Sequence, residues 1–370
     1  MLLIRKYTFA ALACLATLAG CGDNGEDNPK TEYDRKAMLT NYADNLIVPG
    51  YEALKSETDQ LATAVAAFTA NPTAATLATA RTEYQEAYLA WQDVSVYEFG
   101  PADEQMLRNS LNIYPTSATQ IESNISSGTY DLQTTANLSA KGFPALDYLL
   151  YGAATDAELL NQYTTGAQAA NRNKYLQDIT NLISQQANAT YTGWTSGNTA
   201  QSFKESGGTA VGSAVGNLVN QFNSDIDMTK RFKVGIPSGR FTGGTPVPDR
   251  VEAFYSQQSL ALLERNLRAQ KAIFMGVSAN STNGPGLDDY LDHVEAKYGN
   301  TTLANAIIQQ YDAALAAVAA VPAPLGQAVT SNTQAVTKVY DELQKLIVLT
   351  KTDMPAALGV AITYTDNDGD

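Results

Sequence analysis

Apolar residues recur at helical spacing along most of this chain, and this periodicity constrains the fold more than any other feature. Two segments show it most clearly, with apolar side chains three or four residues apart: Leu303, Ile307, Tyr311, Leu315 and Val318, then Val336, Val339, Leu343 and Leu346. Such spacing places the apolar residues on one face of a helix. Strand patterns are nearly absent, apart from residues 360–364. We therefore expect an all-α fold in which amphipathic helices pack as up-down bundles.

Two irregular stretches divide the helical pattern. Residues 192–209 are rich in Gly, Ser, Thr and Asn, and residues 233–246 contain too many Gly and Pro for a helix. We expect two helical-bundle halves, residues 37–191 and 192–370, with long irregular crossover segments. We also expect one long helix over residues 248–275, and a kink or split at Pro49-Gly50 because proline disrupts a helix interior.

The N-terminus has the pattern of an export signal. Arg5 and Lys6 precede a short apolar run, and Leu18-Ala19-Gly20-Cys21 places small residues directly before a cysteine. This pattern predicts a signal peptide over residues 1–20, with Cys21 lipidated and residues 21–36 forming a polar tether. A plain signal peptide and a short membrane helix are the alternatives, although the run is short for a bilayer. The protein would then lie in the cell envelope, with the lipid as its only attachment to a membrane. That membrane would be the outer membrane, and the protein would face either the periplasm or the cell surface.

Charge and histidine content limit the possible activities. The chain has 38 acidic and 24 basic residues, for a formal net charge of −14, which argues against a nucleic-acid partner. His293 is the only histidine, so one chain cannot form a two-histidine metal site. The sequence assigns no cofactor with certainty. Any cation bound here must take mostly oxygen ligands, which favours iron or calcium over zinc.

Carboxylates at two places are candidate site residues. Asp147 lies in an expected short helix, residues 142–152, and its leucine neighbours suggest partial burial. A buried carboxylate needs a partner, and Arg108, Arg240 and Lys233 are the cations we consider. Asp288 and Asp289 follow Gly284-Pro285-Gly286. They can be acids that interact favourably with the dipole at a helix N-terminus, or they can be ligands of a metal site made only of oxygen atoms.

Residues 142–152 resemble a motif of the imelysin-like family, G-x-H-x-x-E. Gly142 matches, and the continuation Tyr148-Leu149-Leu150-Tyr151-Gly152 is similar to the family's. Trp91 with Glu98-Phe99-Gly100-Pro101 resembles a second family stretch, and three further segments are similar: residues 233–237, 251–260 and 286–291. The resemblance spans residue 36 to the end. It implies two helical-bundle halves with a site between them, and a role in iron acquisition or in peptide cleavage by a metal held on the motif His and Glu.

The chain departs from this motif at its two functional positions. Pro144 stands where the histidine is expected and Asp147 where the glutamate is expected. Because proline offers no side-chain donor or acceptor, a metal ligand or base is lost. The leading hypothesis is a non-catalytic binding lipoprotein linked to iron or metal uptake, with an uptake-system protein as partner. An imelysin-type metallopeptidase and a surface interaction scaffold are the alternatives.

The candidate ligand-binding residues follow from this hypothesis. Asp147 is the candidate metal ligand. The full set combines the motif stretch with charged residues expected near it: Gly142, Pro144, Asp147, Tyr148, Glu98, Arg240, Asp288 and Asp289.

Overall fold

The computed structural model describes residues 32–322 and 324–364. Cys21, the expected signal peptide and most of the tether lie outside the described residues, so their lipidation and export stay predictions. The described residues from Asp34 onward form one compact unit. Their regular structure is helical except for one hairpin of two two-residue strands and one isolated β-bridge, which confirms the all-α prediction. Over this part of the chain, no helix has the length and apolar character needed to cross a membrane.

Between residues 32 and 206 the structure has ten α-helices, one π-helix and one 3-10 helix. In chain order they are α1 (Arg35–Asn41), the π-helix η1 (Tyr42–Ile47), α2 (Val48–Ala70), α3 (Ala74–Val94), α4 (Pro101–Glu104), α5 (Leu107–Leu111), α6 (Ala118–Ser127), the 3-10 helix η2 (Thr135–Ala140), α7 (Gly142–Tyr151), α8 (Asp156–Thr164), α9 (Ala169–Thr195) and α10 (Thr199–Glu205).

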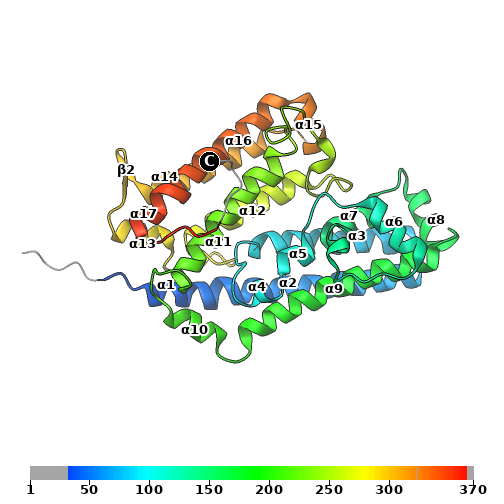
Figure 1. Cartoon of the computed structure of the whole chain (residues 1–370), viewed down its shortest axis with the longest axis horizontal. Coiled ribbons are helices and arrows are strands. Elements are labelled where there is room, and N and C mark those ends of the chain that lie inside the picture. The colour runs from blue at the N-terminus through cyan, green and yellow to red at the C-terminus, as the bar shows by residue number, and fades with distance from the viewer. Residues whose placement is uncertain (1–31, 323, 365–370) are drawn as a thin grey trace, which may run out of the picture. The chain divides into compact units, whose positions relative to one another are not determined.

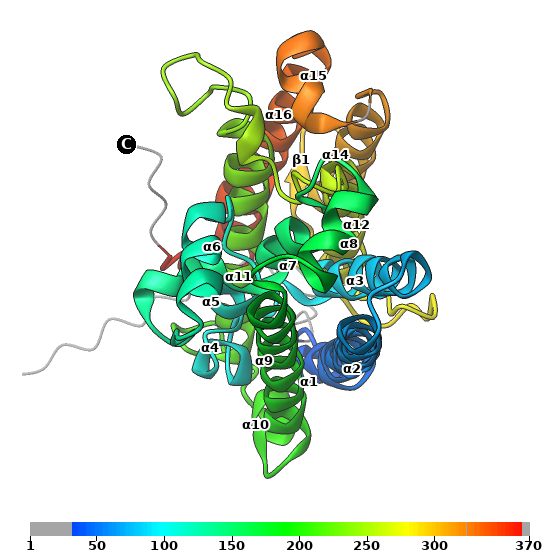
Figure 2. The same ribbon diagram turned by 90° about the vertical axis from the view of Figure 1, so that its right-hand side faces the viewer.

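The long helices α2, α3 and α9 form the framework of this region. Helix α2 packs against both α3 and α9, and α7 packs against α9 and α3 (Figures 1 and 2). Thr73 starts α3 with a capping box to Thr76, which fixes the entry of the helix. Apolar positions at helical spacing, such as Leu61, Phe68 and Ile183, are fully buried between these helices. This burial agrees with the helical apolar spacing expected along most of the chain.

The helix does not split at Pro49-Gly50, which was one of the two outcomes expected there. Helical backbone continues from α1 through η1 into α2, and the hydrogen-bond ladder widens to π spacing just before Pro49. Pro49 lies in the first turn of α2, where its missing N–H is tolerated. A Cβ on Gly50 would come within 2.9 Å of Val94 Cγ1, so glycine permits close packing of α2 against the end of α3.

Further helices and a short hairpin follow. They are α11 (Ala214–Met228), the π-helix η3 (Thr229–Gly235), the 3-10 helix η4 (Pro248–Arg250), α12 (Ser259–Phe274), α13 (Leu287–His293), β1 (Lys297–Tyr298), β2 (Thr301–Thr302), α14 (Leu303–Ala319), α15 (Leu325–Ser331), α16 (Thr333–Ile347), the π-helix η5 (Val348–Asp353) and α17 (Met354–Leu358). The strands β1 and β2 are antiparallel.

Helix α12 connects this second set of helices to the first. It packs against α14 on one side and against α3 on the other, while α16 packs against α14 and α11 (Figure 1). The division into halves at residues 37–191 and 192–370 stays a prediction, and α9 runs through its boundary to Thr195.

Three expectations about local structure are wrong. The long helix expected over residues 248–275 begins only at Ser259, and residues 251–258 are irregular, with positive φ at Ala253 and Gln257. The expected loop 192–209 contains the end of α9 and all of α10. Residues 360–364 form no strand, because the side chain of Asn220 takes the hydrogen bonds of Ala361 and Thr363.

Candidate functional site

The motif carboxylate, Asp147, is buried and accepts three hydrogen bonds. Its side chain extends from α7, and the residue is 2 % exposed. Oδ2 accepts the backbone N–H of Tyr255 at 2.7 Å, and Oδ1 accepts that of Ser256 at 3.0 Å. The hydroxyl of Tyr84 also donates to Oδ1, at 3.1 Å. Burial raises the pKa of the Asp147 carboxyl, and these donors oppose that rise.

The start of α7 fixes the position of Asp147. Gly142 has φ of +75°, and a Cβ there would lie 2.3 Å from the carbonyl oxygen of Leu111. Only glycine allows this approach to the end of α5. Pro144 lies in the first turn of α7, three residues before Asp147 and on the same side of the helix. Both residues line a cavity of about 200 Å³, so the two motif positions meet at one place.

Each cation expected to pair with Asp147 has a different partner, so that expectation is wrong. Arg108 Nη2 lies 2.7 Å from Asp225 Oδ1, Lys233 pairs with Glu252, and Arg240 lies 3.6 Å from Asp341. The physical reason is that two backbone N–H groups and a tyrosine hydroxyl already satisfy the carboxylate of Asp147.

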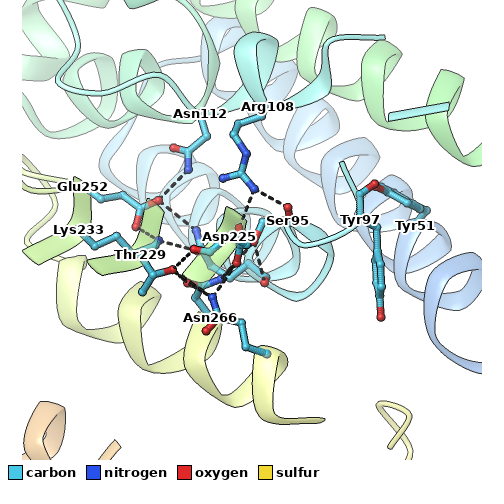
Figure 3. A network of polar contacts seen from close by, with 12 residues as sticks. Tyr51, Ser95, Tyr97, Arg108, Asn112, Asp225, Thr229, Lys233, Glu252 and Asn266 are labelled. Carbon is cyan, nitrogen blue, oxygen red and sulfur yellow. Dashed lines mark hydrogen bonds and ion pairs between the residues drawn. The ribbon is translucent and has the colours of Figure 1, made fainter. Parts of the chain in front are cut away.

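A buried polar network surrounds Asp225 of α11 (Figure 3). Its carboxylate accepts hydrogen bonds from Ser95 and Arg108 on Oδ1, and from Asn266 and Gln270 on Oδ2, at 2.7 to 3.1 Å. Burial alone would raise the pKa of Asp225. Arg108 and the amide donors outweigh burial, so the pKa is lowered and the group stays ionised.

Glu252 forms the second centre of this network. Its carboxylate accepts hydrogen bonds from Lys233, Gln92 and Asn112, and all four residues are buried. The hydroxyl of Tyr88 donates to the amide oxygen of Asn112 at 2.6 Å, which turns the amide nitrogen toward Glu252. The network therefore connects α3 and the segment after α5 with η3 and residues 251–258.

Asp225 and Glu252 were not among the site residues predicted from the sequence. Asp225 lies three residues after Phe222 and beside Ile226, within the apolar stripe of α11. A carboxylate on an apolar helix face is a signal that periodicity could have supplied. Glu252 falls in a segment expected to be helical, where an acidic residue carries no special signal.

A second cavity, of about 190 Å³, lies beside the network. Arg108, Asp225 and Lys233 contribute to its polar side. Tyr114 lines both this cavity and the one at Asp147. The two cavities are therefore neighbours.

The other predicted site residues do not line either cavity. Tyr148 donates to Glu122 at 2.7 Å and packs edge-on against the ring of Tyr255. Asp289 caps the backbone N–H of Gly286 at 3.0 Å. Arg240 is exposed and lies over the ring of Tyr340.

Burial raises the pKa of two predicted acidic residues. Asp288 has one carboxyl oxygen buried without a hydrogen-bond partner, and burial raises its pKa to about 6. Burial raises the pKa of Glu98 further, to about 7, and the nearby Arg108 opposes that rise. The binding roles of these residues stay predictions.

Metal ligation by Asp147 also stays a prediction. Within residues 32–322 and 324–364, no three His, Cys, Asp or Glu side chains cluster closely enough to hold a metal ion. The three hydrogen bonds to Asp147 use lone pairs that a cation would need.

Comparison with known proteins shows similarity along most of the chain. A family model described as imelysin, Peptidase_M75, matches residues 47–352. The curated iron-regulated protein A of Synechococcus elongatus is 22 % identical over 304 residues, which cover 78 % of this chain and 78 % of the relative.

Solved structures show that the fold is shared. A protein from Parabacteroides distasonis has a TM-score of 0.74 at 19 % identity and covers 89 % of this chain and 96 % of its own. An imelysin-like protein from Psychrobacter arcticum has a TM-score of 0.69 at 18 % identity. The match covers 90 % of this chain and 97 % of that protein.

Proposed function

The chain belongs to the imelysin family, and from that premise we propose that it is a non-catalytic binding protein of the cell envelope, linked to iron uptake. The similarity to a relative named iron-regulated protein A supports the link to iron. The sequence around Cys21 supports an envelope location through a lipid anchor. An uptake-system protein would be the partner.

The bonding of Asp147 is the single observation that carries the non-catalytic part. A metallopeptidase needs a metal-bound water and a general base that can reach it. Here the motif carboxylate binds the backbone N–H groups of Tyr255 and Ser256, and Pro144 has no side-chain donor or acceptor. In this proposal Asp147 holds residues 251–258 in place, and the ligand binds in the adjoining cavities.

An uptake experiment in cells tests the link to iron. A deletion strain grown under iron limitation should take up less labelled iron than the parent, and the wild-type gene should restore uptake. Cys21→Ala should fail to restore it, because the protein loses its anchor. Arg268→Ala, which changes an exposed side chain that lines neither cavity, is the control and should restore it. Unchanged uptake in the deletion strain would remove the link to iron.

Assays with purified protein distinguish the remaining alternatives. Fe³⁺, Ca²⁺, Mn²⁺ and haem are titrated into the wild type, and peptide cleavage is measured with and without a chelator. The proposal expects no cleavage. Chelator-sensitive cleavage would favour a metallopeptidase. Recovery of one specific envelope partner, with iron uptake unchanged, would favour a scaffold.

A further inference from the structure

The cavity beside the Asp225 network is lined by polar and by apolar side chains, which we call its polar wall and its apolar wall. Arg108 and Tyr114 contribute to the polar wall, whereas Ile113, Met228 and Phe232 contribute to the apolar wall. Lining residues come from both predicted halves, 37–191 and 192–370. Phe232 is 40 % exposed, which is unusual for a large apolar side chain beside a buried polar network.

The polar wall offers hydrogen-bond donors in excess. Arg108 uses only Nη2, which donates to Asp225 and to the carbonyl of Ser95. Nε is buried without a partner, and Nη1 forms no hydrogen bond with any described residue. The hydroxyl of Tyr114 likewise has no partner in the part of the chain that the structure describes, and burial raises its pKa, so it stays protonated.

The acceptors of the network are already in use. Asp225 accepts hydrogen bonds from four side chains, and Glu252 accepts from three. Neither carboxylate therefore satisfies the remaining donors of Arg108 and Tyr114. A guanidinium with unused donors beside a cavity favours an oxygen anion, and its planar shape matches a carboxylate.

The volume sets the size of the occupant. An apolar cavity of about 150 Å³ holds one benzene molecule. The present cavity, of about 190 Å³, has room for a single ring and one small polar group. The apolar side chains of Ile113, Met228 and Phe232 suit the ring, and the donors suit the polar group.

We infer that this cavity binds a small organic carboxylate with one compact apolar body, about the size of benzoate. The carboxylate contacts Arg108 and the hydroxyl of Tyr114, and the ring lies against Ile113, Met228 and Phe232. This inference rests on the proposed binding function and names the class of its ligand.

Binding of benzoate to the purified full-length mature protein, measured by calorimetry, tests the inference. Benzamide has nearly the same shape without the charge, and inorganic phosphate has charge without the apolar body. We expect benzoate to bind at least about tenfold more tightly than benzamide, because a charge-assisted hydrogen bond is lost, and phosphate to bind more weakly than benzoate. Equal binding of benzoate and benzamide, or no benzoate binding at millimolar concentration, would overturn the inference.

Variants locate the binding. Ile113→Trp places an indole in the cavity without changing the network and should abolish binding. Phe232→Ala removes one apolar wall and should weaken it. Phe241→Ala is the matched control, since Phe241 is 37 % exposed and does not line the cavity. Circular dichroism confirms that each variant is folded, and unchanged binding in folded Ile113→Trp would place the ligand elsewhere. The iron-uptake experiment is independent, so absence of benzoate binding with intact uptake rejects only the ligand class.

Discussion

The carboxylate of Asp147 accepts the backbone N–H of Tyr255 at 2.7 Å, across 108 residues of sequence. It accepts the N–H of Ser256 as well, at 3.0 Å. These bonds take the place of intrahelical bonds and hold residues 251–258 in an irregular path. That path carries Glu252 into the buried network with Lys233. The motif position thus organises the neighbouring polar centre.

Removing this carboxylate should destabilise the protein. Asp147→Ala leaves two backbone N–H groups and the Tyr84 hydroxyl without an acceptor in a buried place, and we expect a loss of about 2–4 kcal/mol. Asp249→Ala, at an exposed carboxylate on the rim of the same cavity, should change stability by less than about 0.5 kcal/mol. Urea unfolding of both variants measures the difference, and equal losses would argue against a structural role for Asp147.

Gly142 should be intolerant of any side chain. Gly142→Ala incurs the left-handed backbone cost of about 1 kcal/mol and also a clash with Leu111 that adds about 1–3 kcal/mol. Gly299→Ala is the control, because Gly299 has φ of +58° and open space around its Cβ position. Thermal unfolding should show the larger loss for Gly142→Ala. A similar loss in both variants would mean that α7 can move away from α5.

The ion pair of Arg108 with Asp225 should contribute far more to the free energy of unfolding than a surface ion pair does. Arg108→Met leaves the carboxylate of Asp225 buried without its cation, and we expect a loss of about 3–5 kcal/mol. Arg268→Ala breaks an exposed pair with Glu264 within α12 and should cost less than about 0.5 kcal/mol. The double variant Arg108→Met with Asp225→Asn should recover part of the first loss. Denaturant unfolding tests all three, and a small effect of Arg108→Met would contradict the burial of Asp225.

Glu98 should make stability depend on pH. Burial raises its pKa from 4.5 to about 7. Between these values the folded state binds more protons than the unfolded state, so stability falls as pH rises from 4.5 to 7 and then levels off. The full effect is on the order of 3 kcal/mol.

The variant Glu98→Gln isolates this effect. Glutamine does not ionise, so the variant should gain stability relative to the wild type between pH 4 and pH 8. Asp288 also titrates in this range, with a pKa of about 6, but it is present in both proteins and its effect cancels in the comparison. Urea unfolding at a series of pH values gives the two curves, and parallel curves would show that Glu98 is not responsible.

Local sequence signals predicted the helices that depend on local interactions. Apolar periodicity identified α14 and α16. Periodicity failed over residues 251–258, because a side chain from α7 binds the N–H groups that a helix would use. No local pattern reveals such a competitor.

The candidate site was predictable only in part. The leucines around Asp147 indicated its burial, and the structure confirms this. Its partners could not be predicted, since every residue except proline carries a backbone N–H and the sequence does not show which of them lies near Asp147. Asp225 carried a signal as an acid on an apolar helix face, whereas Glu252 resembles an ordinary helical acid. For both residues, only the fold brings the cationic partner, Arg108 or Lys233, to the carboxylate.

Amide hydrogen exchange at Tyr255 and Ser256 tests most directly whether Asp147 holds this segment. We predict that both amides are protected in the wild type, that Asp147→Asn lowers their protection selectively, and that added Fe³⁺ leaves the wild-type pattern unchanged. Rapid exchange of both amides in the wild type, or loss of their protection when Fe³⁺ binds, would instead assign the carboxylate of Asp147 to a ligand.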